Sequence, residues 1–284
     1  MKTEFFKPGT LEEALGLLDQ FKENAVIVNG GTDIVEKIVS HEVEPEAIVY
    51  IRDIPECRGI EQNDGTLSIG GAVTYREIQE SPLCTRIAGL IQAVSEIGSP
   101  PIRNVATPAG NIANAAPAAD CNIMLLALEA EVVLACTGGE RVVALQDIWL
   151  NPQETTIRKN ELIRAIRIAI PSKDTSTAYV KMTRRKAQDI SRVSVGVSLT
   201  LTGTFCQEIR IALGAVNKVP VRAYSLEKMM AGKEVETGLA EIRSVFPAEA
   251  TPRKSYKKLV TNAVIERAIR KAYETIMAGG ECIG

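Results

Sequence analysis

Two stretches of the sequence carry most of the information about the fold: AVIVNGGTD at residues 25–33 and IGSPPIRNVATPAGNIANAAPAAD at residues 97–120. The first begins with a short apolar run that predicts a buried strand. This strand leads directly into Asn29-Gly30-Gly31-Thr32-Asp33. Two consecutive glycines let the backbone approach a ligand closely, and such a concave loop binds anions. A tight turn that requires positive φ is the alternative interpretation.

The second stretch breaks the helical pattern with four prolines and three asparagines. Its small residues and few charges favour an ordered, buried loop, and connections of this length are usually functional or disordered. Within it lies the turn Thr107-Pro108-Ala109-Gly110-Asn111. Backbone N–H groups and Thr107 would bind the phosphates of a dinucleotide, and Asp120 would accept from its ribose hydroxyls. Each loop, taken alone, is more often a structural turn, and the presence of two such loops in one domain makes ligand binding as well supported as the turn interpretation. The Rossmann and P-loop glycine motifs are absent from the sequence, which disfavours both kinds of nucleotide site.

Composition narrows the class of protein further. The chain has 284 residues, and 33 Lys and Arg against 35 Asp and Glu leave a net charge of −2, which argues against nucleic-acid binding. The single histidine, His41, excludes a two-histidine zinc site, so redox or group-transfer chemistry would belong to a cofactor. Six scattered cysteines without a C-x-x-C pair are typical of reduced thiols and predict a cytoplasmic protein. No apolar stretch reaches 18 residues, so no membrane span is predicted.

The remaining patterns divide the chain near residue 173. Residues 11–51 form a small α/β unit, with Thr10 as a helix cap, a short helix at 34–39 and a strand at 48–51. Further strands are expected at 67–69, 132–134 and 162–170, and further helices at 75–80, 88–97 and 123–128. A polar linker follows at 171–177. Alternating residues at 193–201 predict a half-buried strand beside 209–216, and a final helix begins after Ser255.

The two glycine-containing stretches resemble those of the FAD-binding (medium) subunit of the molybdenum hydroxylases. This family includes xanthine dehydrogenase and aerobic carbon monoxide dehydrogenase. Residues 161–166 (ELIRAI) and 181–190 (KMTRRKAQDI) also look like family landmarks. The resemblance covers nearly the whole chain. It implies an α+β protein, with a two-part α/β FAD-binding domain of the vanillyl-alcohol-oxidase (PCMH) type at 1–172. A smaller α+β C-terminal domain would occupy 175–284.

The resemblance also implies which residues contact FAD. The first phosphate-binding segment corresponds to Val26, Ile27, Val28, Asn29, Gly30, Gly31, Thr32 and Asp33, and the second to Ala106, Thr107, Ala109, Gly110 and Asn111. Asp120 matches an acidic residue that bonds the FAD sugar portion. Ile97 and Ile163 (or Ala165) match apolar positions near the flavin. Lys181 matches a lysine near the flavin ring, and Tyr179 matches a tyrosine that covers this ring in some members of the family. From the residues alone, Lys181 could instead be an ordinary solvated lysine. The basic run Arg184-Arg185-Lys186 is typical of a surface patch or of one that faces a partner protein.

This sequence departs from the family pattern at two of these places. Ala109 replaces the first of two glycines in the second loop, which requires a negative φ at that residue. Ile97 replaces the phenylalanine of the long eukaryotic members, which would weaken stacking on the flavin. His41 lies outside both matching segments, so noncovalent FAD is expected. No catalytic or metal-ligating residue is predicted in this chain.

The implied function is electron transfer within a complex. A large subunit would carry the molybdenum cofactor and a small subunit two [2Fe–2S] clusters, in a dimer of heterotrimers. FAD on this chain would pass the electrons to NAD+ or another acceptor. Two alternatives remain open at this point: a self-sufficient flavin-dependent oxidase or dehydrogenase, and a non-enzymatic subunit that has lost FAD.

Overall fold

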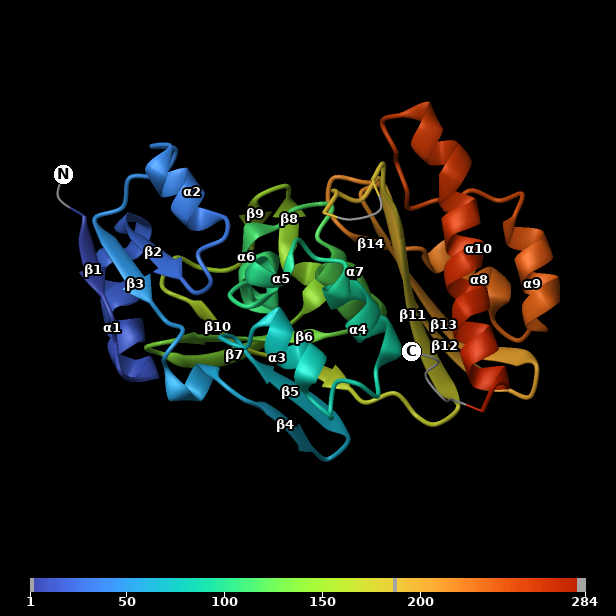
Figure 1. Ribbon diagram of the computed structural model, residues 1–284, viewed down its shortest axis with the longest axis horizontal. Helices are drawn as coiled ribbons and strands as arrows, with labels where there is room; N and C mark the ends of the chain where they lie inside the picture. Colours follow the sequence, from blue (N-terminus) through green and yellow to red (C-terminus); the bar gives the residue numbers. More distant parts are fainter. Residues whose placement is uncertain (1–2, 186–187, 280–284) are drawn as a thin grey trace.

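A computed structural model describes residues 3–185 and 188–279. The chain forms three blocks along its longest axis (Figure 1). A three-stranded sheet lies at the N-terminal end, a five-stranded sheet with short helices lies in the middle, and a four-stranded sheet with α8, α9 and α10 lies at the other end. The α+β class and the two-part N-terminal region followed by a smaller C-terminal part are therefore confirmed.

The first block is the α/β unit expected from the sequence. Its sheet is parallel in the order β1-β3-β2, with strands β1 (Glu4–Phe6), β3 (Ala47–Tyr50) and β2 (Ala25–Val28). Its helices are α1 (Leu11–Phe21) and α2 (Ile34–Val39). Thr10 caps α1 as predicted, because its hydroxyl accepts from Glu13 N at 3.2 Å. Strand β1 was not anticipated.

The second block contains an antiparallel sheet in the order β4-β5-β10-β6-β7. Its strands are β4 (Ile60–Asn63), β5 (Thr66–Gly70), β10 (Leu162–Ala169), β6 (Glu131–Cys136) and β7 (Gly139–Ala144). A small hairpin adds β8 (Trp149–Asn151) and β9 (Glu154–Thr155), and short 3₁₀ turns lie at Lys22–Asn24, Pro55–Cys57 and Leu145–Asp147. Strand β10, the last of these in sequence, lies at the centre of the sheet.

Residues 98–120 are ordered and partly buried, as expected, but they form short helices rather than the single loop that the sequence predicts. Five helices pack in this block: α3 (Tyr75–Glu80), α4 (Ala88–Ser95), α5 (Pro100–Arg103), α6 (Pro108–Asn114) and α7 (Asp120–Ala127). The prolines Pro100 and Pro108 begin α5 and α6 rather than breaking helices. At the first helical position proline loses no hydrogen bond, because the N–H there would be unpaired in any case.

The third block is an antiparallel sheet in the order β11-β12-β13-β14. Its elements are β11 (Thr175–Met182), β12 (Val193–Thr202), β13 (Phe205–Gly214), β14 (Val221–Arg222), α8 (Tyr224–Met230), α9 (Val235–Ile242) and α10 (Ser255–Met277). Helices α8 and α9 were not anticipated. Ser255 is the first residue of α10, and Lys254 occupies the cap position assigned to Ser255 from the sequence.

Strand β12 is buried on both faces, not on one as its alternation predicts. Its large residues, such as Val195 and Val197, belong to the same apolar cluster as Val264 and Ile265 of α10. Its small residues face α7 instead: a Cβ on Gly196 would lie 2.9 Å from Ile123 O. Small side chains alternate here because they let a helix approach the strand, and not because they face water.

The second and third blocks meet through two helices, since α4 packs against β11 and α7 against the strands beside it. Helix α7 is the more deeply buried of the two. All eight of its residues are buried, and it packs against β12 and β13 as well as α4. Cys57, Cys84, Cys121, Cys136 and Cys206 are free, as expected, while Cys282 lies outside the described residues. Among the described helices, none combines the length and apolar character needed to cross a membrane.

Candidate functional site

The first glycine loop, residues 29–33, connects β2 to α2. Gly31 has φ of +72°, so the turn interpretation is correct at this residue. Gly30 is a glycine for another reason: a Cβ there would lie 2.1 Å from Val105 O. The close approach at Gly30 is therefore to the protein's own backbone, just before the second loop, and the expectation of a ligand beside its missing side chain is replaced by this contact.

The second loop is the start of α6. Thr107 caps the helix, because its hydroxyl accepts from Gly110 N at 3.0 Å. Ala109 lies in helical conformation without positive φ, which meets the condition set for an alanine at this position. Asn29 joins the two loops: its amide nitrogen donates to Thr107 Oγ1 at 3.2 Å and to Gly71 O at 2.7 Å. The two sequence motifs therefore form one structural unit.

A second contact ties the loops together further along the chain. Asn114, at the end of α6, donates to Asp33 Oδ1 at 3.1 Å, and Lys37 Nζ donates to Asn114 Oδ1 at 3.4 Å. Helix α2 is thus attached to α6 through Asp33, which was a predicted contact residue, and through Lys37 and Asn114, which were not.

A cavity of about 600 Å³ lies between these loops and the end of β10. This volume is within the range of small-molecule and cofactor sites. Fourteen of the predicted contact residues line it: Val26, Ile27, Asn29, Gly30, Gly31, Thr32, Asp33, Ile97, Ala106, Thr107, Ala109, Gly110, Asn111 and Ile163. The structure therefore brings together segments that are more than 50 residues apart in sequence.

The cavity wall also contains polar residues that sequence reasoning missed. They are Lys37, Tyr75, Asn114, Gln153, Thr155, Arg158, Lys159 and Glu161. Only Glu161 had a signal, because it begins the ELIRAI landmark. Its carboxylate is 1% exposed and accepts from Arg141 Nε at 2.7 Å, Arg141 Nη2 at 2.8 Å and Arg158 N at 2.8 Å. This ion pair fixes the chain immediately before Ile163.

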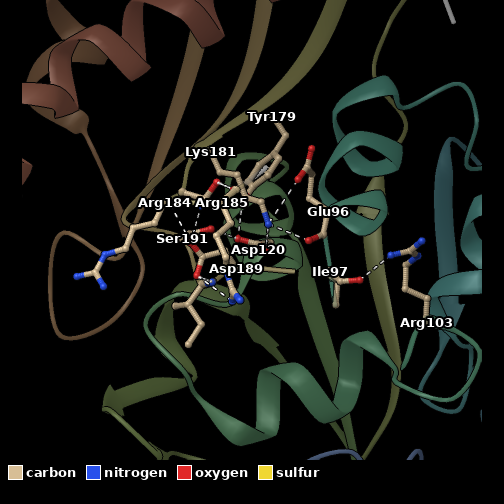
Figure 2. Close-up of polar contacts among 12 residues, drawn as sticks. Glu96, Ile97, Arg103, Asp120, Tyr179, Lys181, Arg184, Arg185, Asp189 and Ser191 are labelled. Carbon is tan, nitrogen blue, oxygen red and sulfur yellow. Dashed lines mark hydrogen bonds and ion pairs between the residues drawn. The ribbon is translucent and has the colours of Figure 1, made fainter. Parts of the chain in front are cut away.

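The structure does not bring Val28, Asp120, Tyr179 and Lys181 into this wall. Asp120, at the start of α7, accepts from Tyr179 Oη at 2.6 Å, Ser191 Oγ at 2.5 Å and Lys181 Nζ at 3.1 Å (Figure 2). Burial, followed by the charge of Asp120, raises the pKa of Tyr179 well above its ordinary value. Lys181 is 7% exposed, so it is not a solvated lysine. These residues connect the N-terminal and C-terminal parts of the molecule, and their contact with FAD stays a prediction.

The backbone at Glu96 and Ile97 links the side chains around Asp120 to the cavity. Lys181 Nζ donates to Glu96 O at 2.8 Å, and Arg103 Nη1 donates to the next carbonyl, Ile97 O, at 2.8 Å (Figure 2). Ile97 itself lines the cavity. The backbone that positions this apolar side chain is therefore held from both sides. Arg184 and Arg185, in the neighbouring loop, are exposed, while Lys186 lies outside the described residues.

The wall has the chemistry that FAD would require. Asn29 Oδ1 and Asn111 Oδ1 are buried and have no hydrogen-bond partner among the described residues, so they offer acceptors to a polar ligand. Ile97, Ile157 and Ile163 supply apolar surface for a ring. A ligand with a flat apolar part and a polar, hydroxylated part fits this combination.

Comparison with known proteins identifies the class. Residues 1–172 match the family described as the FAD binding domain in molybdopterin dehydrogenase. Residues 177–272 match the CO dehydrogenase flavoprotein C-terminal domain. The chain is therefore an FAD-binding oxidoreductase subunit. It belongs to the family of flavoprotein subunits of the molybdenum hydroxylases, which includes those of carbon monoxide dehydrogenase and xanthine dehydrogenase.

Individual relatives resemble the chain over almost its full length. The nicotinate dehydrogenase FAD-subunit of Eubacterium barkeri is 28% identical, covering 93% of this chain and 94% of the relative. The carbon monoxide dehydrogenase medium chain of Hydrogenophaga pseudoflava is 27% identical, covering 95% and 96%. The solved structure of reconstituted CO dehydrogenase from Oligotropha carboxidovorans superimposes with a TM-score of 0.91 at 26% identity, covering 96% of this chain and 98% of the other.

Proposed function

We propose that FAD binds noncovalently in the cavity between the two loops and that this chain relays electrons within a larger complex. The observation that carries the proposal is the contact of Asn29 with Thr107, which makes one binding unit of the two loops inside the FAD-binding domain. His41 is absent from the cavity wall and its side chain is 79% exposed, which supports noncovalent attachment.

The residues of the wall bind and orient the cofactor. The amide oxygens of Asn29 and Asn111 accept from hydroxyl groups of the cofactor, and Ile97 and Ile163 exclude water from its ring. Asp33, Asn114 and Lys37 keep α2 and α6 together around it. When bound, FAD exchanges single electrons with iron–sulfur clusters and electron pairs with a two-electron acceptor.

The partners follow from the same proposal. The name "medium chain" of the Hydrogenophaga relative supports a larger and a smaller partner. The large subunit would hold the molybdenum cofactor and the small subunit the [2Fe–2S] clusters, in a cytoplasmic dimer of heterotrimers. NAD+ or another acceptor would take the electrons from FAD. The two domains proposed for this chain are residues 1–172 and 175–284.

The experiment that tests the relay compares the chain alone with the chain plus its partners. The isolated chain should retain FAD, and its flavin absorption should not bleach with carbon monoxide, nicotinate or xanthine. Bleaching should require both partner subunits. Bleaching of the isolated chain by an organic substrate would instead establish a self-sufficient flavin enzyme. A colourless chain that binds no added FAD would establish a subunit that has lost the cofactor.

A further inference from the structure

Tyr75 is a polar residue of the cavity wall whose side chain is unexplained by the fold. It is the first residue of α3 and is 1% exposed. Its backbone N–H donates to Ala106 O at 3.0 Å, which fixes it to the residue immediately before the Thr107 cap. The ring packs in the main apolar cluster with Ile78 and Leu90. Phenylalanine would fill the same space.

The hydroxyl of Tyr75 has no hydrogen-bond partner among the described residues. A buried hydroxyl without a partner destabilises the folded protein, and native proteins rarely leave one. Two other atoms of the same wall, Asn29 Oδ1 and Asn111 Oδ1, are also buried without partners. Three unpaired polar atoms in one cavity wall indicate a polar ligand that completes them.

The charge state of the phenol supports a donor role. Burial, and then the nearby Cys121, Asp120 and Asp33, raise the pKa of Tyr75 well above its ordinary value. The phenol therefore keeps its proton and presents an O–H group. The amide oxygens of Asn29 and Asn111 can only accept, so the wall combines one donor with two acceptors.

We propose that Tyr75 Oη donates a hydrogen bond to an oxygen of the phosphate and ribityl portion of bound FAD. This inference rests on the proposed function, because it takes FAD as the ligand of the cavity. It assigns to Tyr75 a part in cofactor binding that neither glycine loop supplies.

The test is Tyr75→Phe, with two measurements on the cofactor-free full-length protein. Fluorescence titration should show FAD bound about tenfold more weakly, the equivalent of one lost hydrogen bond. The thermal midpoint of the cofactor-free variant should equal or exceed that of the wild type, because an unpaired hydroxyl has been removed. Tyr224→Phe is the matched control, since Tyr224 is 44% exposed and its hydroxyl contacts Gln146 outside the cavity.

The outcomes separate the two levels of inference. Wild-type protein without affinity for FAD would overturn the proposed function and the role of Tyr75 with it. Tight wild-type binding with unchanged affinity in Tyr75→Phe would overturn only the role of Tyr75. A Tyr75→Phe variant that loses thermal stability without FAD would show that the hydroxyl has a structural partner. Titration with riboflavin distinguishes the oxygens, because a ribityl contact weakens its binding too and a phosphate contact does not.

Discussion

Glu161 is a buried carboxylate that the fold can tolerate only because donors surround it. Burial by itself would raise the pKa of Glu161, but hydrogen bonds from Arg141 and from Arg158 N outweigh it and lower the pKa from its ordinary 4.5. Removing one partner from such a pair leaves the other charge without compensation. The ion pair lies two residues before Ile163, so it also determines where the end of β10 meets the cavity.

We expect Glu161→Gln to lower the free energy of unfolding by about 1–3 kcal/mol at pH 7, measured by urea denaturation. Because the folded pKa is depressed, the stabilisation is complete above pH 4.5 and is lost as pH falls through the folded pKa. The gap between wild type and variant should therefore narrow at acid pH. Glu80→Gln, on an exposed pair with Arg76, is the control and should change stability by less than about 0.5 kcal/mol. A gap that widens at acid pH would contradict this account.

At the scale of elements, the sequence predicts local patterns well and long-range ones poorly. Helix α3 has the predicted bounds, because Thr74 and Glu77 form a capping box within four residues. Helices α5 and α6 were missed, because a proline at a helix start and a proline in a loop look alike without the fold. Strand β12 was read as half-buried, since its small residues resemble a solvated face until α7 is placed against them.

Gly30 shows how an element depends on a distant neighbour. Gly30→Ala should force the first loop away from Val105 O, since the added Cβ would meet backbone that cannot rotate away. We expect at least tenfold less FAD retained on purification and a loss of about 1–3 kcal/mol in stability. The ratio of FAD to protein and the thermal midpoint check this.

Gly16→Ala is the matched control for that substitution. Gly16 lies within α1, and a Cβ there would meet nothing within 4 Å. The change should raise stability by about 0.5–1 kcal/mol and leave FAD retention unaltered. Equal FAD retention in Gly30→Ala and Gly16→Ala would refute the role assigned to the contact between the loops.

At the scale of the whole molecule, the candidate site was predictable in its continuous segments and not in its scattered ones. Residues 26–33 and 106–111 are each a run in sequence, so a motif reveals them. Lys37, Tyr75 and Arg158 come from α2, α3 and the connection before β10, and Asn114 comes from the far end of α6; only the folded chain brings them to one cavity. Asp120, Tyr179 and Lys181 were each predicted to contact FAD, and the structure joins them to one another at the junction of the two parts of the chain.

Substitution of Asp120 tests whether the junction contributes only to the stability of the fold or also to FAD binding. Asp120→Ala leaves Lys181, 7% exposed, without its partner on α7, so we expect stability to fall by about 3 kcal/mol. Calorimetry of the cofactor-free and FAD-loaded forms measures this. An equal loss in both forms supports an interdomain role alone, and a loss confined to the loaded form supports the predicted contact with FAD. Asp174→Asn, on the exposed connection before β11, should change neither form.

The position of β10 has a consequence for how the protein is made. The ribosome completes β4, β5, β6 and β7 before it reaches the strand that must separate β5 from β6. Until then two hairpins expose unpaired edges, which favour aggregation. Closing the sheet is a late, non-local step and therefore a slow one. Ile163 arrives with the same strand, so the cavity wall is complete only after β10 has been synthesised.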